Sequence, residues 1–254
     1  MTYAPSKITA VEGRLTAVRM RIADACRRAG RDPASVRLLP VSKTVTAARV
    51  RLAVETGLTE FGENKVQEAR EKAAALSDLP VRWSIIGHLQ TNKVKHVARF
   101  AHEFQALDSL RVAEALDRRL QIEGRGLDVF IQVNSSGEAS KFGLPADEVL
   151  GFARQLPSFT TLRRRGLMTL ALFSSDAARV RPCFQRMRAL REVLRQDGPG
   201  GCAFDELSMG MSGDYELAIE EGATVVRVGQ AIFGPRPLPD SHYWPGEPSL
   251  GAAA

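Results

Sequence analysis

The chain has 254 residues, of which 44% are hydrophobic and 25% are charged, as in ordinary water-soluble globular proteins. This composition excludes disordered, collagen-like and coiled-coil chains. Lysine and arginine (35) exceed aspartate and glutamate (29), but the basic residues are spread along helical stretches and only 6% of the residues are aromatic. A nucleic-acid groove normally interleaves basic and aromatic side chains. We therefore expect no nucleic-acid partner, whereas small phosphorylated ligands stay possible.

Three further sequence features bear on the compartment. No window approaches the roughly 18 to 20 consecutive apolar residues of a membrane span, and residues 1–10 contain no apolar signal core. The three cysteines are odd in number and far apart, which indicates neither a disulfide framework nor a zinc site. The four histidines form no metal-binding motif. The sequence predicts a cytoplasmic protein without a metal and without a membrane partner.

A leading amphipathic helix is predicted over residues 7–29, where apolar side chains recur every three or four positions before Gly30. Short apolar runs then alternate with helix-patterned segments. The eight runs are 36–41, 58–62, 82–86, 103–107, 127–133, 160–168, 203–208 and 224–228. The helix-patterned segments are 46–56, 64–76, 91–99, 109–123, 145–156, 176–196 and 213–221.

Eight strand–helix units predict an α/β fold, a single (β/α)8 TIM-type barrel over residues 1–235 with the extra N-terminal helix. A doubly wound open sheet is the runner-up, because no glycine-rich dinucleotide fingerprint follows an early strand. Pro40 lies inside the first run although proline cannot donate to a strand ladder. Residues 236–254 contain four prolines and no periodicity, which predicts a mobile tail.

Barrel proteins place their sites at the carboxyl ends of the strands, and often bind a phosphate in the loops after the seventh and eighth strands. The polar residues that follow the eight runs are SKT (42–44), EN (63–64), GH (87–88), DS (108–109), NSS (134–136), Thr169, MGMSG (209–213) and GQ (229–230). Hydroxyl and backbone N–H groups in the seventh loop suit an anion. The plain alternative is that Ser212 only caps the next helix. Arg227 and Gly229 alternate onto one face of the eighth strand, where they could meet the same ligand.

Lys43 ends the first strand at the same mouth. A lysine there is either a solvated terminal charge or a desolvated, reactive amine. An amine beside a phosphate site suggests a Schiff base with a phosphorylated carbonyl compound. A class I aldolase and a pyridoxal-phosphate site both use this pair, and spacing alone does not choose between them. Among the histidines, only His88 is placed at a strand end where it could meet a ligand.

Several multi-residue blocks, in order from about residue 7 to residue 236, resemble the pyridoxal phosphate homeostasis protein family. The blocks are VSKT (41–44), FGENKVQE (61–68), IGHLQTNK (86–93), QVN (132–134), LSMGMSGD (207–214) and VRVGQAIFG (226–234). The resemblance implies a barrel similar to the N-terminal domain of alanine racemase, with pyridoxal 5′-phosphate as its cofactor.

The resemblance also implies roles for the blocks. The lysine of the SKT block, Lys43, holds the cofactor as an internal aldimine. Ser208 or Ser212, together with Gly229, binds its phosphate.

The resemblance further implies that the arginine of the RxG block, Arg227, approaches the pyridine nitrogen and that Asn64 and His88 lie beside the ring. The arginine keeps that nitrogen unprotonated, because two cationic donors cannot share one acceptor without a large free-energy cost. The ring is then a weaker electron sink than one paired with a carboxylate. Three positions depart from the family's usual residues: Pro40, Thr46 where a proline is commoner, and Ser84 where a histidine is frequent.

Racemisation on this cofactor needs two acid–base groups, one on each face of the substrate. In alanine racemases the second acid–base group is a tyrosine. It comes from a separate C-terminal domain and is contributed across a dimer. None of Tyr3, Tyr215 and Tyr243 is an obvious counterpart, and only residues 236–254 follow the barrel. We expect a monomer that holds the cofactor for intracellular homeostasis without strong catalysis and passes it to apoenzymes or amino acids. The alternatives are a small pyridoxal-phosphate-dependent racemase and, less favoured, a class I Schiff-base aldolase.

Overall fold

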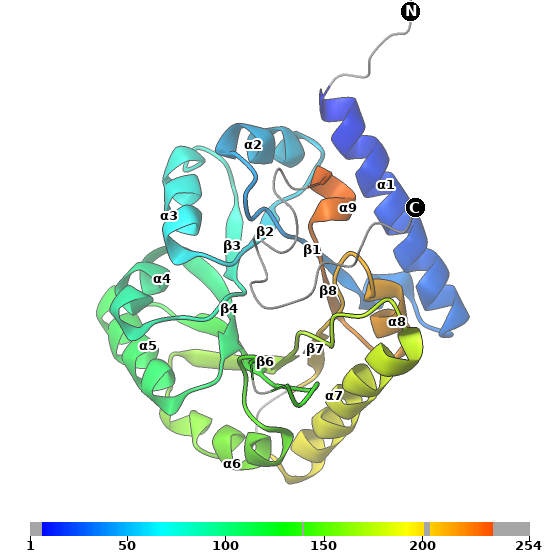
Figure 1. The fold of residues 1–254 in the computed structure, drawn as a ribbon. Helices are drawn as coiled ribbons and strands as arrows, with labels where there is room; N and C mark the ends of the chain where they lie inside the picture. Colours follow the sequence, from blue (N-terminus) through cyan, green and yellow to red (C-terminus); the bar gives the residue numbers. More distant parts are fainter. Residues whose placement is uncertain (1–6, 139, 201–203, 236–254) are drawn as a thin grey trace, which may run out of the picture.

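Helices surround a barrel of parallel strands in the computed structural model (Figure 1), which describes residues 7–138, 140–200 and 204–235. The strands in these ranges are β1 (Arg37–Pro40), β2 (Glu60–Glu63), β3 (Arg82–Ile85), β4 (Ala101–Leu107), β5 (Leu127–Gln132), β6 (Leu162–Met168), β7 (Glu206–Ser208) and β8 (Val225–Val228). Their order is β1-β8-β7-β6-β5-β4-β3-β2, and all neighbours in it run parallel. Strands follow chain order around the ring, which confirms the predicted barrel; a doubly wound sheet would reverse that order at its centre.

The α-helices of the described residues form the outer ring. They are α1 (Lys7–Arg28), α2 (Ala47–Glu55), α3 (Val66–Ala75), α4 (Val94–Phe100), α5 (Leu110–Glu123), α6 (Val149–Ala153), α7 (Ala177–Asp197), α8 (Tyr215–Glu220) and α9 (Gln230–Phe233). Short 3₁₀ turns add η1 (Pro33–Ser35), η2 (Thr91–Lys93), η3 (Ala146–Glu148) and η4 (Leu156–Ser158). Every predicted helical segment contains a helix. The sequence did not predict α9, because four residues are too few to show a helical period.

The leading helix α1 packs against α8, α9 and α2 on the outside of the barrel (Figure 1). Its apolar stripe, which includes Val11, Leu15 and Val18, is buried against them. Burying such a stripe is what stabilises an amphipathic helix on a globular protein. The leading helix therefore has the place and the buried face that its sequence period predicts.

Pro40 is accommodated where β1 faces β2. The backbone N–H groups of Arg37 and Val41 donate toward β8. Because N–H directions alternate along a strand, the nitrogen of Pro40 points away from β8, toward β2. There the two strands meet only in an isolated bridge between Val41 and Gly62. A missing N–H removes no ladder hydrogen bond at this seam, which is why a proline fits inside β1.

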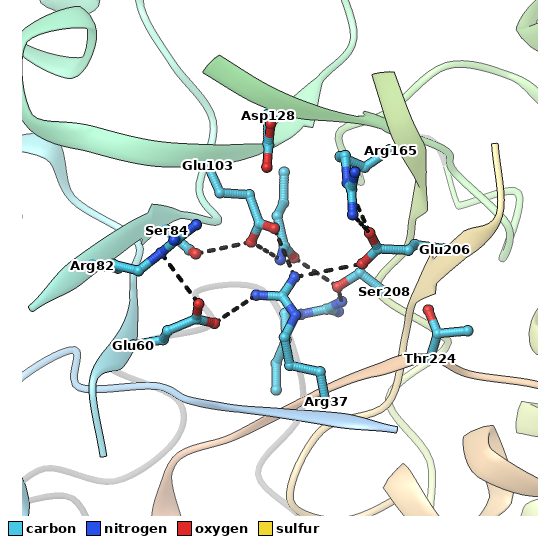
Figure 2. Close-up of polar contacts among 12 residues, drawn as sticks. Arg37, Glu60, Arg82, Ser84, Glu103, Asp128, Arg165, Glu206, Ser208 and Thr224 are labelled. Atoms are coloured by element: carbon cyan, nitrogen blue, oxygen red, sulfur yellow. Dashed lines mark hydrogen bonds and ion pairs between the residues drawn. The ribbon is translucent and has the colours of Figure 1, made fainter. Parts of the chain in front are cut away.

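Charged side chains fill the base of the barrel, at the amino ends of the strands (Figure 2). The guanidinium of Arg37 donates to Glu60 at 2.8 Å and to Glu103 at 2.7 Å, and lies 3.7 Å from Glu206. Ser84 donates to Glu103 at 2.8 Å. The residue that departs from the family's usual histidine thus belongs to a polar network in the barrel interior.

Thr46, the third departure, is the N-cap of α2, and its hydroxyl accepts the N–H of Arg49 at 3.4 Å. Within the described ranges, no helix is long and apolar enough to cross a membrane. The predicted tail, 236–254, lies outside the described residues.

Candidate functional site

A cavity of about 590 Å³ opens at the carboxyl ends of the strands. Loops that follow seven of the eight strands contribute to its wall. The predicted site residues that line it are Lys43, Asn64, His88, Ser212, Arg227 and Gly229. Cavities of a few hundred cubic ångströms are typical of small-molecule sites. The fold therefore brings six residues, scattered over nearly 190 positions of sequence, to one place.

The seventh predicted residue, Ser208, does not line this cavity. It ends β7 and is fully buried. Its hydroxyl accepts a hydrogen bond from Arg227 at 2.7 Å and donates to the side-chain oxygen of Gln105 at 2.6 Å. Ser208 thus lies one layer beneath the cavity floor, behind the arginine.

Arg227 forms the buried, cationic part of the wall. Its guanidinium donates to Ser208 and, at 2.6 Å, to the backbone carbonyl of Thr169, and both partners are uncharged. Burial lowers the pKa of Arg227 to about 10, against the opposing effect of Asp214 and Glu103. The side chain still carries its charge at neutral pH, so the cavity wall presents a cation that its hydrogen-bond partners do not neutralise.

The loops after β7 and β8 are tied together beside this arginine. The hydroxyl of Ser212 accepts the N–H of Gly229 at 3.2 Å. Helix α8 begins after Asp214, so the alternative interpretation of Ser212 as its cap is wrong. Asp214 instead folds the loop by accepting the N–H of Met211 at 2.6 Å, and burial raises its pKa. A Cβ at position 229 would lie 3.0 Å from the carbonyl oxygen of Val41, so glycine lets this loop approach β1.

Lys43 projects from the short loop between β1 and α2. Ser42 before it is fully buried, and Thr44 after it has a φ of 66°. Thr44 is the one non-glycine residue with positive φ among those the structure describes. A β-branched residue rarely adopts this left-handed conformation. The backbone that carries Lys43 is therefore held in a strained shape.

Asn64 and His88 line the cavity from the neighbouring loops after β2 and β3. A Cβ on Gly87 would lie 2.3 Å from the carbonyl oxygen of Asn64, so only glycine permits this contact between the two loops. The imidazole of His88 stacks on Phe142 with ring centroids 4.3 Å apart, and its Nδ1 lies 3.9 Å from Asp108. Burial raises the pKa of the Asp108 carboxyl. His88 is thus oriented by an aromatic ring and a carboxylate at the edge of the cavity.

Sequence reasoning missed part of the wall. Phe142, Leu172 and Phe173 line the cavity from the loops after β5 and β6, which show no helix or strand period. Two exposed phenylalanines in polar loops were the available signal. Gln105, which accepts the hydroxyl of Ser208, and Thr169, whose carbonyl accepts a hydrogen bond from Arg227, are not indicated in these roles by the sequence, which marks Thr169 only as a polar residue after the sixth run.

Comparisons with known proteins agree with this geometry. Residues 14–237 match the family described as alanine racemase, N-terminal domain. A pyridoxal phosphate homeostasis protein of Pseudomonas aeruginosa is 44% identical over 219 residues, which cover 86% of this chain and 93% of that protein.

Two solved structures resemble the fold closely. PipY of Synechococcus elongatus, solved with pyridoxal phosphate bound, is 35% identical with a TM-score of 0.77, and the match covers 88% of this chain and 100% of PipY. An unknown protein from Bifidobacterium adolescentis is 34% identical with a TM-score of 0.84, covering 91% of this chain and 98% of the other. These similarities confirm the resemblance drawn from the sequence blocks.

Proposed function

Because the chain belongs to the alanine racemase N-terminal domain family and, within it, to the pyridoxal phosphate homeostasis proteins, we propose that it binds pyridoxal 5′-phosphate and maintains the supply of this cofactor. The observation that carries the proposal is the convergence of Lys43, Arg227 and the Ser212–Gly229 contact on one cavity. An amine for the aldehyde, a hydrogen-bond donor for the pyridine nitrogen and an anion-binding loop pair for the phosphate suit the three polar parts of this ligand.

The residues present fit the cofactor part by part. When bound, it supplies an aldehyde that a lysine amine captures reversibly. Lys43 provides that amine. Ser212 and Gly229 would hold the phosphate, and Arg227 would lie toward the pyridine nitrogen and keep it from gaining a proton. Ser208 supports Arg227 from beneath, so of the two serines we assign the phosphate contact to Ser212.

We further propose that the site holds its ligand without strong catalysis. A cation at the pyridine nitrogen makes the ring a weak electron sink, which disfavours carbanion chemistry. Tyr215, the only tyrosine in the described ranges, is buried and does not line the cavity. His88 lies at the edge of the cavity, and we assign proton handling beside the ligand to Lys43. Apoenzymes or free amino acids are the recipients we propose for the released cofactor.

The direct test is titration of the purified protein with pyridoxal 5′-phosphate. The wild-type protein is expected to develop the visible absorbance band of a lysine-linked cofactor, and Lys43→Ala is expected to lose it. Lys95→Ala, on the exposed surface of α4, is the matched control and is expected to keep the band. Absence of the band in the wild-type protein, or its persistence in Lys43→Ala, contradicts the proposal.

The enzymatic alternatives make different predictions. A racemase exchanges the α-proton of an amino acid with deuterated solvent at a high rate, which the proposed carrier does not. An aldolase retains a sugar phosphate on Lys43 after borohydride reduction in place of a pyridoxyl group. Exchange at the rate of a dedicated racemase, or a trapped sugar phosphate, would replace the proposal.

A further inference from the structure

A second lysine is buried beside the loop that carries Lys43. Lys72 lies on α3 and is 5% exposed. Its ammonium lies 2.7 Å from the carbonyl oxygen of Ser42, 2.6 Å from a carboxylate oxygen of Glu63 and 2.7 Å from one of Glu68. All three donors of the ammonium are thereby directed at the β1–α2 loop or at groups that contact it.

The two carboxylates extend these contacts to both neighbours of the cofactor lysine. The oxygen of Glu63 that Lys72 contacts also accepts the hydroxyl of Ser42, at 2.6 Å. The oxygen of Glu68 that Lys72 contacts also accepts the backbone N–H of Thr44, at 2.7 Å. One ammonium therefore connects to the residue before Lys43 twice and to the residue after it once.

The strained backbone shows what these contacts achieve. A threonine keeps a φ of 66° only where its surroundings determine the conformation. The surroundings of Thr44 supply the hydrogen bond from its N–H to Glu68. Without that acceptor the loop can relax toward ordinary backbone angles, which redirects the side chain of the residue just before Thr44.

Packing alone does not account for Lys72. A buried ammonium needs opposite charges to offset its desolvation, and an apolar side chain of similar volume often serves stability at least as well. One partner of Lys72 is the carbonyl of Ser42, and the other two, Glu63 on β2 and Glu68 on α3, each accept a hydrogen bond from the loop that presents Lys43. A charge placed in this way fixes a geometry.

We propose that Lys72, together with Glu63 and Glu68, is a positioning residue for Lys43. The cluster fixes the backbone on both sides of Lys43 so that its amine projects into the cavity. Lys72 is sealed beneath the loop and does not itself capture the cofactor. This inference rests on the proposed function, since it assigns a role toward the lysine that binds the ligand.

The test compares charge-removing substitutions at the cluster. Lys72→Met keeps the length and the apolar stem and is expected to raise the apparent Kd for pyridoxal 5′-phosphate about tenfold, because it removes charge-assisted hydrogen bonds that hold the loop. The share of borohydride-fixed label on Lys43, measured by mass spectrometry, falls with it. Lys95→Met, the same change on the exposed face of α4, is expected to match the wild-type protein.

Two further variants, Glu68→Gln and Glu68→Ala, keep the inference testable if Lys72→Met does not fold. In Glu68→Gln the amide oxygen still accepts the N–H of Thr44, so its Kd should lie between those of the wild-type protein and Glu68→Ala. Wild-type affinity in all three variants overturns the inference, as does lowered thermal stability with unchanged Kd for the folded fraction. Failure of the wild-type protein to bind the cofactor overturns the proposed function instead.

Discussion

Arg37 on β1 and Arg227 on β8 both point into the barrel, but their guanidinium groups have different hydrogen-bond partners at the two ends of the barrel. At the base, the guanidinium of Arg37 is paired with the carboxylates of Glu60 and Glu103. Burial alone would lower the pKa of Arg37, yet these carboxylates outweigh it and raise the pKa. At the mouth, Arg227 donates to two neutral oxygens and burial lowers its pKa.

This difference separates a structural charge from a functional one. A buried cation that is paired with carboxylates gains its stabilisation from the fold itself. A buried cation with neutral partners pays a desolvation penalty that a ligand's lone pair or negative charge can offset. The barrel base is therefore an internally balanced network, whereas Arg227 at the mouth has no carboxylate among its hydrogen-bond partners and can offer its charge to a ligand.

The largest effect is expected at the base. Arg37→Met leaves Glu103, which is nearly buried, without its cationic partner, so it should lower the free energy of unfolding by about 3 kcal/mol. Urea unfolding of the ligand-free protein measures this loss. The Kd for the cofactor should not change in the folded variant. A loss below about 1 kcal/mol would remove the distinction between the two arginines.

Arg227→Met is expected to give the opposite pattern. Losing a charged donor in the cavity should weaken cofactor binding by about 2 kcal/mol, a change in Kd of about 30-fold. The unfolding free energy of the ligand-free protein should stay within about 1 kcal/mol, because removing the desolvation penalty offsets the two lost hydrogen bonds. Calorimetric titration measures the change in Kd, and urea unfolding measures the change in the free energy of unfolding. Destabilisation as large as that of Arg37→Met would show that both ends are structural.

A carboxylate at the mouth gives a pH test. Burial raises the pKa of Glu63 from 4.5 to about 6, with Lys72 and Ser42 opposing. The folded state therefore takes up this proton before the unfolded state does as the pH falls. Relative to Glu63→Gln, the wild-type protein should gain up to about 2 kcal/mol of stability as the pH falls through the window from about 6 to 4.5. Urea unfolding near both ends of the window measures it, and a relative loss of stability at the lower pH would contradict the assignment.

The smallest effects separate the two serines. Ser212→Ala should raise the Kd for pyridoxal 5′-phosphate about fivefold, the value of one hydrogen bond, and leave the Kd for pyridoxal, which has no phosphate, unchanged. Ser208→Ala should weaken both ligands alike, since it acts through Arg227. Parallel absorbance titrations with the two ligands decide the matter. A phosphate-dependent effect at Ser208 alone would exchange the two roles.

The barrel could be predicted because its strands and helices carry local signals. Strands buried in a parallel barrel are short and apolar, and the surrounding helices show a 3.6-residue period. The observed strand limits differ from the predicted ones where the pattern is ambiguous: among the described residues 204–208 of the seventh run, only 206–208 form β7. The short helix α9 has too few residues to reveal a period.

Most of the candidate site could be predicted because its residues lie at a strand end or in the loop that follows it. Lys43, Asn64 and Gly229 are found by that rule, since parallel strands bring their carboxyl ends together. The role of Lys72 could not be predicted, because a glutamate four residues before a lysine is also typical of a solvated helix face. Only the packing of α3 beneath the β1–α2 loop turns that spacing into a buried cluster. Likewise, nothing local indicates that Ser208 lies behind Arg227.

The position of the cofactor after chemical fixation tests the role of Lys43 most directly. Purified protein is incubated with pyridoxal 5′-phosphate, reduced with borohydride, digested and analysed by mass spectrometry. We predict one phosphopyridoxyl group on Lys43 and none on Lys72, which is buried in its cluster. A label that is absent, or that lies on another lysine while Lys43 is unmodified, would contradict this prediction.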